Sequence, residues 1–310
     1  LEQGRSVTIE NWADRWSEDN ASLREVVLYG LKGAAAYTDH AQILGREDEK
    51  LYASFHEALD VLTRDGVSND ELLRWALLTG EINLRAMELL DEANTGAYGH
   101  PVPTKVRVTP VKGKAIVVSG HDLKDLKALL EQTKGTGINV YTHGEMLPAH
   151  MYPELRKYPH LKGHYGGAWQ KQRDEFEKFG GPILGTTNCV LIPRDDNTYL
   201  DRFFTTRVTA VPGAKIIKDN DFSEVIKRAQ EVGPVKTTET KKSTVGFHYS
   251  AVLGLADDIV EAVQDGKIKH FFVIGGCDGA EPGRNYFNQF AQHTPQESLI
   301  LTMGCGKYRI

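Results

Sequence analysis

Two of the three cysteines in this 310-residue chain occupy the same kind of local sequence. Cys277 follows the apolar run Phe271 to Ile274 and two glycines, and Cys305 follows the run Ser298 to Met303 and one glycine. Each run has the composition of a buried β-strand that ends at glycine. The segment between them, Arg284 to His293, has the length and apolar spacing of a helix. The pattern predicts a strand–helix–strand unit with a thiol just past the carboxyl end of each strand.

Three further residues with metal-binding side chains hold comparable positions. His121 and Glu145 come directly after predicted strands, and Cys189 lies within the apolar run Pro182 to Ile192. In open α/β sheets, ligands bind in the crevice outside the carboxyl ends of the strands. Glycines beside such residues let the backbone approach a bulky ligand closely. The sequence therefore predicts that one imidazole, one carboxylate and three thiols are available for a metal centre.

The mixture of donor atoms indicates which metal centre this would be. Thiolates are soft ligands that favour iron–sulfur clusters, zinc or copper, whereas imidazole and carboxylate suit iron and other borderline metals. A structural zinc site is normally closed, with four ligands and short Cys-x-x-Cys spacings. The chain has no such spacing. The mixed set favours an iron–sulfur–oxygen centre that keeps an open position for a substrate.

Simpler roles stay open for these residues. A free cysteine such as Cys189 often only packs in the core, His121 could begin a helix, and Glu145 could be a solvated turn residue. Two motif interpretations fail. His143-Gly144-Glu145 matches half of the zinc deaminase signature, but the required Pro-Cys-x-x-Cys is missing. Gly275 to Gly279 is not a phosphate loop, because no Gly-Lys-Ser/Thr follows.

The elements that would position these residues change character along the chain. Residues 20 to about 95 have helical periodicity, which predicts three helices joined by short polar loops: Leu23 to Leu44, Glu47 to Asp65 and Asn69 to Ala93. Such helices form a small antiparallel bundle or part of a larger one. After the loop Thr95 to Pro110, which is rich in Gly and Pro, strands and helices alternate. The expected strands are Lys114 to Val118, Ile138 to Thr142, Pro182 to Ile192 and Arg207 to Val211, with helices at Asp122 to Gln132, Asp221 to Val232 and Leu253 to Gln264.

This alternation predicts the α/β class, with a Rossmann-like, mostly parallel sheet covered by helices. A lysine-rich link, Lys236 to Ser243, marks a second boundary. We therefore predict a helical domain at 1–107, an α/β domain at 108–236 and a partial second α/β domain at 237–310. A doubly wound domain usually needs about 100 residues or more. We expect the last domain to be truncated, or to complete its sheet with another chain.

Composition limits the remaining classes. The net charge of -5 gives no basic field for nucleic acid. No apolar run approaches the roughly 20 residues of a membrane span, and the first residues lack the features of a signal peptide. Three cysteines in a chain of this size do not suggest a secreted disulfide framework. The expectation is a cytoplasmic protein with no nucleic-acid or membrane partner.

Six longer stretches carry a more specific signal: LYGLKGAAAYTDHAQILG (28–45), GHDLKDL (120–126), VYTHGEMLPAHMYPELRKYPHLKGHYGGAWQ (140–170), GPILGTTNC (181–189), GGCDGAEPGRNYF (275–287) and LILTMGCGKYR (299–309). Over nearly the whole chain the sequence resembles the hybrid cluster proteins, also called hydroxylamine reductases. That family is related in fold to nickel–iron carbon monoxide dehydrogenases. The resemblance implies a helical domain followed by two α/β domains.

The resemblance also implies a cofactor, a hybrid iron–sulfur–oxygen cluster of the 4Fe-2S-2O type. The family holds it with one histidine, two glutamates and four cysteines, and by motif five of these correspond to His121, Glu145, Cys189, Cys277 and Cys305. In the family the cysteine at the position of Cys277 often carries a persulfide, and Glu145 and His121 would be displaceable or tuning ligands. The fourth cysteine, the second glutamate and a nearby lysine of the family lie past the point where this sequence stops. The family's N-terminal cysteine motif is absent, so its second iron–sulfur cluster is not expected.

The activity that the resemblance implies is reduction of hydroxylamine to ammonia, or of nitric oxide, with Glu145, His121 and Cys277 as the catalytic residues. Electrons would come from a separate flavin or iron–sulfur reductase, in nitrogen metabolism or under nitrosative stress. Two alternatives stay open. One is a non-catalytic, truncated scaffold, apo or with zinc or a partial cluster on Cys277 and Cys305. The other is a redox enzyme of the carbon monoxide dehydrogenase type. The sequence does not fix the oligomeric state.

Overall fold

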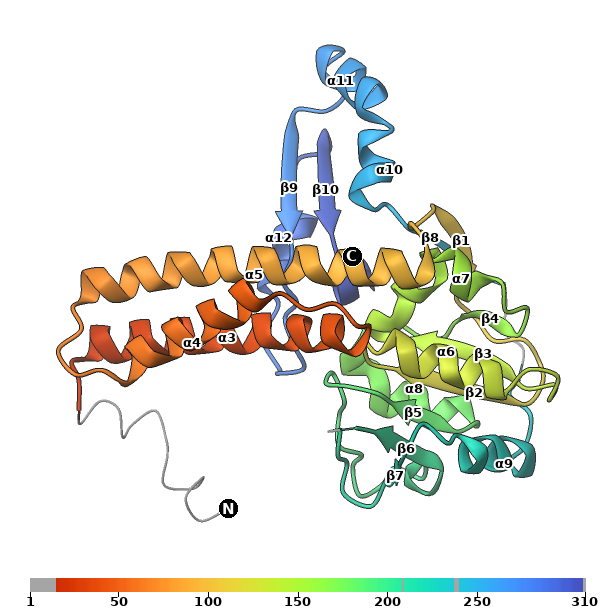
Figure 1. Cartoon of the computed structure of the whole chain (residues 1–310). Helices are drawn as coiled ribbons and strands as arrows, with labels where there is room; N and C mark the ends of the chain where they lie inside the picture. Colours follow the sequence, from red (N-terminus) through yellow and green to blue (C-terminus); the bar gives the residue numbers. More distant parts are fainter. Residues whose placement is uncertain (1–14, 208, 237–239, 309–310) are drawn as a thin grey trace. The chain divides into compact units, whose positions relative to one another are not determined.

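The computed structural model describes residues 15–207, 209–236 and 240–308. The chain divides into two compact units, Leu1–Ala97 and Tyr98–Ile310 (Figure 1). The division lies within the Gly- and Pro-rich stretch that the sequence indicated as a boundary. The further division of the second unit near residue 236 stays a prediction. None of the helices in the described residues is long and apolar enough to cross a membrane.

The first unit contains the three predicted helices: α3 (Glu18–Ile43), α4 (Glu49–Thr63) and α5 (Asn69–Tyr98), whose last residue belongs to the second unit. The Asp48 side chain caps α4 by accepting from the backbone N–H groups of Lys50 and Leu51. Arg24 of α3 is only 1% exposed, and its guanidinium donates to the carbonyls of Leu62 and Arg64. Arg24 therefore satisfies carbonyls at the end of α4 that a helix cannot satisfy itself.

The second unit is built on a six-stranded, fully parallel sheet with the strand order β4-β3-β2-β5-β6-β7. Its strands are β2 (Ala115–Ser119), β3 (Asn139–His143), β4 (Leu161–His164), β5 (Ile183–Gly185), β6 (Phe203–Thr206) and β7 (Lys215–Ile217). The central strands β2 and β5 and the neighbouring β6 are buried along their length. The α/β fold class with a parallel sheet is confirmed.

Helices and short connections complete this sheet: α6 (Leu123–Gln132), α7 (Pro153–Arg156), α8 (Gln172–Phe179), α9 (Ser223–Glu231) and the 3₁₀ helices η1 (Gly144–Met151), η2 (Trp169–Lys171) and η3 (Leu200–Arg202). Two short strands, β1 (Thr104–Arg107) and β8 (Lys242–Val245), pair antiparallel. One hydrophobic core of this unit contains aromatic rings in mutual contact, among them Tyr141, Phe176 and Phe203. Phe176 fixes α8 against the sheet through this cluster.

The last segment forms the predicted strand–helix–strand unit. It contains α10 (Tyr249–Leu253), α11 (Ala256–Gln264), β9 (His270–Ile274), α12 (Tyr286–Gln292), β10 (Ser298–Thr302) and η4 (Gly304–Tyr308). β9 and β10 pair in parallel as a two-stranded sheet. The helix expected at Leu253 to Gln264 is α11, which begins at Ala256 and ends at Gln264; Leu253 is the last residue of the preceding helix, α10. The strand expected at Phe271 to Ile274 is present as β9, but the expectation that it is buried is wrong, since Phe271 and Val273 are 52% and 72% exposed and only Ile274 is buried.

Two other strand predictions are corrected. Only Ile183–Gly185 of the run Pro182 to Ile192 is a strand, because polar residues Thr186 to Asn188 interrupt it and Cys189 has φ +59. Cys189 therefore lies in a loop and not inside a strand. The strand expected at Arg207 to Val211 lies earlier in the chain, as β6, and ends at Thr206. It cannot continue into Arg207, because that residue has φ +53, a left-handed conformation outside the extended region.

Arg207 anchors the start of α6 to the end of β6. Its guanidinium forms ion pairs with Asp122 at 2.7 Å and with Asp125 at 3.0 Å, two carboxylates that are 1% and 0% exposed at the side chain. Asp122 also caps α6 by accepting from the N–H of Asp125. Burial and the neighbouring Asp122 raise the pKa of Asp125 above its ordinary value. The cation is therefore needed to compensate two charges that water does not reach.

We predict that Arg207→Ala lowers the free energy of unfolding by about 3 kcal/mol, because removing one partner leaves buried carboxylates uncompensated. The matched control is Arg228→Ala. Arg228 is similarly exposed at its side chain, but it pairs with Asp201 and Glu231 on the surface, so about 0.5 kcal/mol is expected. Urea unfolding followed by circular dichroism measures both. Equal losses in the two variants would show that Arg207 has no special role.

Candidate metal centre

The candidate metal centre lies where three neighbouring strands of the parallel sheet end. β3, β2 and β5 are adjacent, and Ser119 at the end of β2 pairs with His143 of β3 and with Gly185 of β5. From β2 the chain proceeds to β3 and β4 on one side, while β5, β6 and β7 lie on the other. The boundary between β2 and β5 is thus the topological switch point, where such sheets bind ligands.

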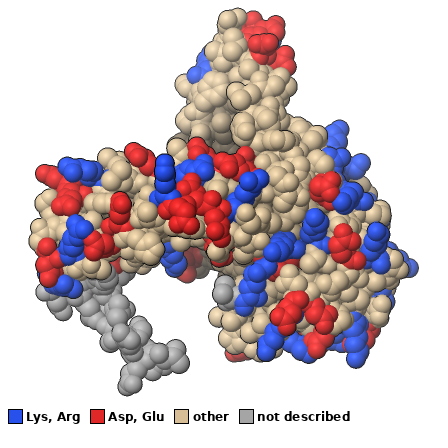
Figure 2. Space-filling model, in the orientation of Figure 1, with Lys and Arg blue, Asp and Glu red and all other residues tan. Residues whose placement is uncertain are grey.

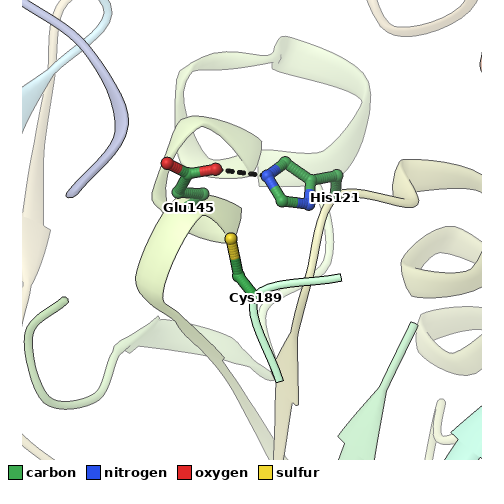
Figure 3. Close-up of side chains that lie close together, drawn as sticks. All are labelled: His121, Glu145 and Cys189. Atoms are coloured by element: carbon green, nitrogen blue, oxygen red, sulfur yellow. Dashed lines mark hydrogen bonds and ion pairs between the residues drawn. The ribbon is translucent and has the colours of Figure 1, made fainter. Parts of the chain in front are cut away.

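Three of the five predicted ligands meet at this point. The ligand atoms of His121, Glu145 and Cys189 all lie within 4.8 Å of one another. Figure 3 shows the imidazole and the carboxylate facing each other, with the Cys189 sulfur directed toward the same space. The Nε2 atom of His121 hydrogen-bonds to Oε2 of Glu145, and both side chains are 28% exposed. The group offers one nitrogen, one oxygen and one sulfur to a borderline metal.

The loop after β2 fixes the orientation of His121. The hydroxyl of Thr187 lies 2.8 Å from Nδ1 of His121, which directs Nε2 toward Glu145. Gly120 has φ +114, and a Cβ there would lie 2.4 Å from the Thr186 hydroxyl and 2.8 Å from the Thr187 backbone nitrogen. Glycine is therefore required for the loops after β2 and β5 to approach each other. A hydrogen bond to the second ring nitrogen is also how proteins orient metal-binding histidines.

The electrostatics of the group favour a cation. The hydrogen bond from His121 lowers the pKa of Glu145 and outweighs the opposing effect of burial. Burial, followed by the charges of Glu145 and Cys305, raises the pKa of Cys189 to about 12. Without a cation, the Cys189 thiol therefore stays protonated at neutral pH, because a thiolate would add negative charge beside a carboxylate. A bound metal ion removes this conflict and stabilises the thiolate, so the donor set fits a metal centre.

The two remaining cysteines differ in their relation to this group. Cys305 is 1% exposed, its sulfur accepts a hydrogen bond from the Trp169 backbone N–H at 3.4 Å, and its main chain hydrogen-bonds to Glu145. Cys305 thus lies beside the three clustered ligands without being one of them. Cys277 is exposed and lies outside the group. None of the three cysteines forms a disulfide bond. The roles assigned to these five residues stay predictions.

Sequence reasoning missed the residues that support the group: Thr187, the N–H of Trp169 and Gly304. Thr187 lies two residues before Cys189 in the quoted stretch GTTNC, so its hydroxyl beside a candidate ligand was a usable signal. Gly304 packs on Glu145, since a Cβ there would lie 2.5 Å from Oε1. That contact joins residues from η1 and η4, and no local pattern indicates it.

Comparison with known proteins identifies the class to which this fold and site belong. The chain is a member of the Prismane/CO dehydrogenase family, which it matches over residues 1–310. It is similar to proteins named hydroxylamine reductase. That of Thermodesulfovibrio yellowstonii is 56% identical over 310 residues, that of Maridesulfovibrio salexigens is 54% identical over 308, and that of Methanocella arvoryzae is 49% identical over 310.

The alignments cover 99–100% of this chain and 57% of each of those three relatives. The chain therefore spans just over half the length of the relatives that it matches. Among solved structures, the fold resembles one chain of an acetyl-CoA synthase/carbon monoxide dehydrogenase, a structure described for the NiZn[Fe4S4] and NiNi[Fe4S4] clusters in its α subunits. The TM-score is 0.68 at 13% identity, over 94% of this chain and 61% of that one. This likeness confirms the fold relationship that the sequence resemblance implied.

We predict that Gly304→Ala disturbs the site more than its backbone strain alone explains. Gly304 has φ +58, and the new Cβ would overlap Oε1 of Glu145. We expect a loss of about 3 kcal/mol in unfolding free energy, from left-handed strain plus overpacking. Gly266→Ala is the control, because Gly266 has φ +70 with open space around its Cβ position; about 1 kcal/mol is expected there. If both variants lose the same amount, Gly304 does not pack on Glu145 in solution.

Proposed function

We propose that this chain forms the cluster-holding part of a hydroxylamine reductase-type oxidoreductase. The main support is that His121, Glu145 and Cys189 converge at the switch point of the sheet. In addition, the chain is 56% identical to a protein named hydroxylamine reductase. The residues that would hold an iron–sulfur centre are these three together with Cys305 and Cys277. The proposed form is the hybrid 4Fe-2S-2O cluster, and the proposed substrate is hydroxylamine or nitric oxide.

When bound, such a centre would pass electrons to a small nitrogen substrate and offer it an open coordination position. The chain's own residues orient the groups that would bind this centre. Thr187 holds the ring of His121 so that Nε2 is directed into the site. The Trp169 N–H donates to the Cys305 sulfur, and such a bond to a cluster-bound thiolate would raise the reduction potential of the centre. The pKa of Glu145 is lowered, so its carboxylate stays ionised. It would offer the metal an anionic oxygen that a substrate could displace.

The remaining parts of the proposal rest on family membership. A separate flavin or iron–sulfur reductase would supply electrons, and the protein would act in the cytoplasm. The charge distribution fits a small substrate better than a nucleic acid, because acidic and basic side chains are interspersed on the face that Figure 2 shows.

The proposal predicts that the chain, reconstituted anaerobically with ferrous iron and sulfide, takes up several irons and gives a paramagnetic cluster signal. Cys189→Ala and Glu145→Ala should each reduce the iron bound per chain, because each removes a donor from the group. His56→Ala, on the exposed side of α4, is the control and should bind as much iron as the unsubstituted chain. The measurements are iron and sulfide content, electron paramagnetic resonance, and ammonia formed from hydroxylamine by reduced protein.

Different failures identify different alternatives. Uptake of a single zinc with no iron would overturn the proposal in favour of a non-catalytic scaffold. Nickel bound at the site together with carbon monoxide oxidation would favour the carbon monoxide dehydrogenase type. A cluster that forms equally well in Cys189→Ala and Glu145→Ala would show that the centre lies elsewhere.

A further inference from the structure

Gln172, the first residue of α8, is a buried amide with no part in the metal group described above. Its side chain is 0% exposed. Its Nε2 atom donates to the carbonyl of Cys189 at 2.6 Å and to the hydroxyl of Ser119 at 3.2 Å, and its Oε1 accepts from the N–H of Leu191 at 2.9 Å. Both N–H groups and the carbonyl of this amide are therefore engaged. It contacts the main chain on both sides of Val190.

The Cys189 backbone needs such support. At φ +59 it is one of the few non-glycine residues in the left-handed region. A side chain at Cβ makes this conformation unfavourable, and it persists only where the surroundings impose it. Here the surroundings are two main-chain hydrogen bonds with Gln172: its Nε2 donates to the carbonyl of Cys189, and its Oε1 accepts from the N–H of Leu191. The first fixes the peptide plane that directly follows the Cα of Cys189, and the second holds the chain one residue further on, so the main chain that carries the thiol is anchored on its C-terminal side.

The same amide connects to the other two ligand loops. Ser119, which accepts from Gln172, is the last residue of β2 and lies two positions before His121. The Ser119 hydroxyl is also 3.3 Å from Nδ1 of His143, the last residue of β3, two positions before Glu145. One hydrogen-bond network thus joins the three loops that carry His121, Glu145 and Cys189.

We propose that Gln172 is a positioning residue that holds Cys189 in its left-handed conformation and so aims the thiol at His121 and Glu145. The use of that thiol as a metal ligand rests on the proposed function. The conformational part does not, because it is a property of the chain without metal. The rival explanation is that Gln172 only satisfies buried polar groups and stabilises the fold.

A second glutamine of the chain serves as a control for the explanation that Gln172 only stabilises the fold. Gln132, at the end of α6, makes the same two-sided contact with another loop: its Nε2 donates to the carbonyl of Asn220 at 2.7 Å, and its Oε1 accepts from the N–H of Phe222 at 2.9 Å. Asn220 is also left-handed, with φ +52. None of these residues contacts the metal group. Gln132→Met therefore removes the same pair of main-chain hydrogen bonds from a left-handed loop outside the metal group, at a glutamine that is exposed where Gln172 is buried.

The first experiment measures the alkylation of each cysteine by N-ethylmaleimide in the metal-free chain. Trypsin places Cys189, Cys277 and Cys305 on the separate peptides 179–194, 270–284 and 285–307, so mass spectrometry follows each rate. In Gln172→Met we expect the Cys189 rate to rise on the order of tenfold, as expected from the lost hydrogen bonds. The rates of Cys277 and Cys305 should stay within a factor of two of the unsubstituted chain. Gln132→Met should leave all three rates unchanged.

The rival explanation predicts other results. If Gln172 only stabilises the fold, Cys305 becomes more reactive together with Cys189, or Gln132→Met has the same effect. Either result, or an unchanged Cys189 rate, overturns the proposal. Should Gln172→Met fail to fold, Gln172→Ala serves instead. It removes the same hydrogen bonds without adding a charge and leaves space for water to reach the freed polar groups, so selective exposure of Cys189 is again expected.

The second experiment titrates the metal-free chain with Co²⁺ and follows the absorption of the thiolate-to-cobalt charge transfer. We expect Gln172→Met to weaken the affinity by about 10- to 100-fold, the usual effect of removing a residue that orients a ligand, and Gln132→Met to leave it unchanged. Cys189→Ala identifies the band. If the unsubstituted chain shows no such band, the metal-binding function fails, while the alkylation rates still decide whether Gln172 holds Cys189. If the band forms with equal affinity in Gln172→Met, the positioning role is wrong.

Discussion

The structure of the site depends on the register of three parallel strands. Ser119 pairs with His143 on one side and with Gly185 on the other, so β2, β3 and β5 end at the same level. The loops that follow must therefore begin together, at one edge of the sheet. A shift of one residue in any of these strands would direct the following side chains to the opposite face. The buried core side chains, such as Val117 and Tyr141 at 0% exposure, prevent that shift by fixing which face each strand presents to the helices.

Charge compensation follows from this geometry. Placing three loops at one edge also gathers acidic groups, namely Glu145 and the buried Asp122 that directly follows His121. The guanidinium of Arg207, which directly follows β6, pairs with Asp122. Glu145 instead lies beside the Cys189 thiol, whose pKa is raised to about 12. The two neighbouring clusters thus differ: the two aspartates pair with the guanidinium of Arg207, whereas Glu145 pairs with the imidazole of His121. The nitrogen, oxygen and sulfur donors of the second cluster are suited to hold a metal cation.

The sequence predicts those structural features whose physical cause lies within a few neighbouring residues. Apolar periodicity within a few residues predicts the three long helices. Periodicity together with the glycines that end strands also predicts that His121 and Glu145 lie just after short strands. The place of Cys189 is not predicted in this way, because its φ of +59 is imposed by Gln172, 17 residues earlier in the chain. The ion pair that joins Arg207 to Asp125 spans 82 residues. Such contacts exist only once the sheet has formed, so apolar periodicity placed Cys189 in a strand that the tertiary structure ends at Gly185.

The same reasoning explains why the five candidate ligands are not equally constrained. His121, Glu145 and Cys189 follow strands in the middle of a six-stranded sheet with buried neighbours on both sides. Cys277 follows β9 in a sheet of only two strands, where Val273 is 72% exposed and where Figure 2 shows a largely uncharged surface. A two-stranded sheet contributes little stability by itself. Cys305 is an intermediate case, because Gly304 and the Trp169 N–H attach it to the larger sheet. A metal centre here would therefore begin from three pre-positioned ligands, with Cys305 close by and Cys277 the least constrained donor.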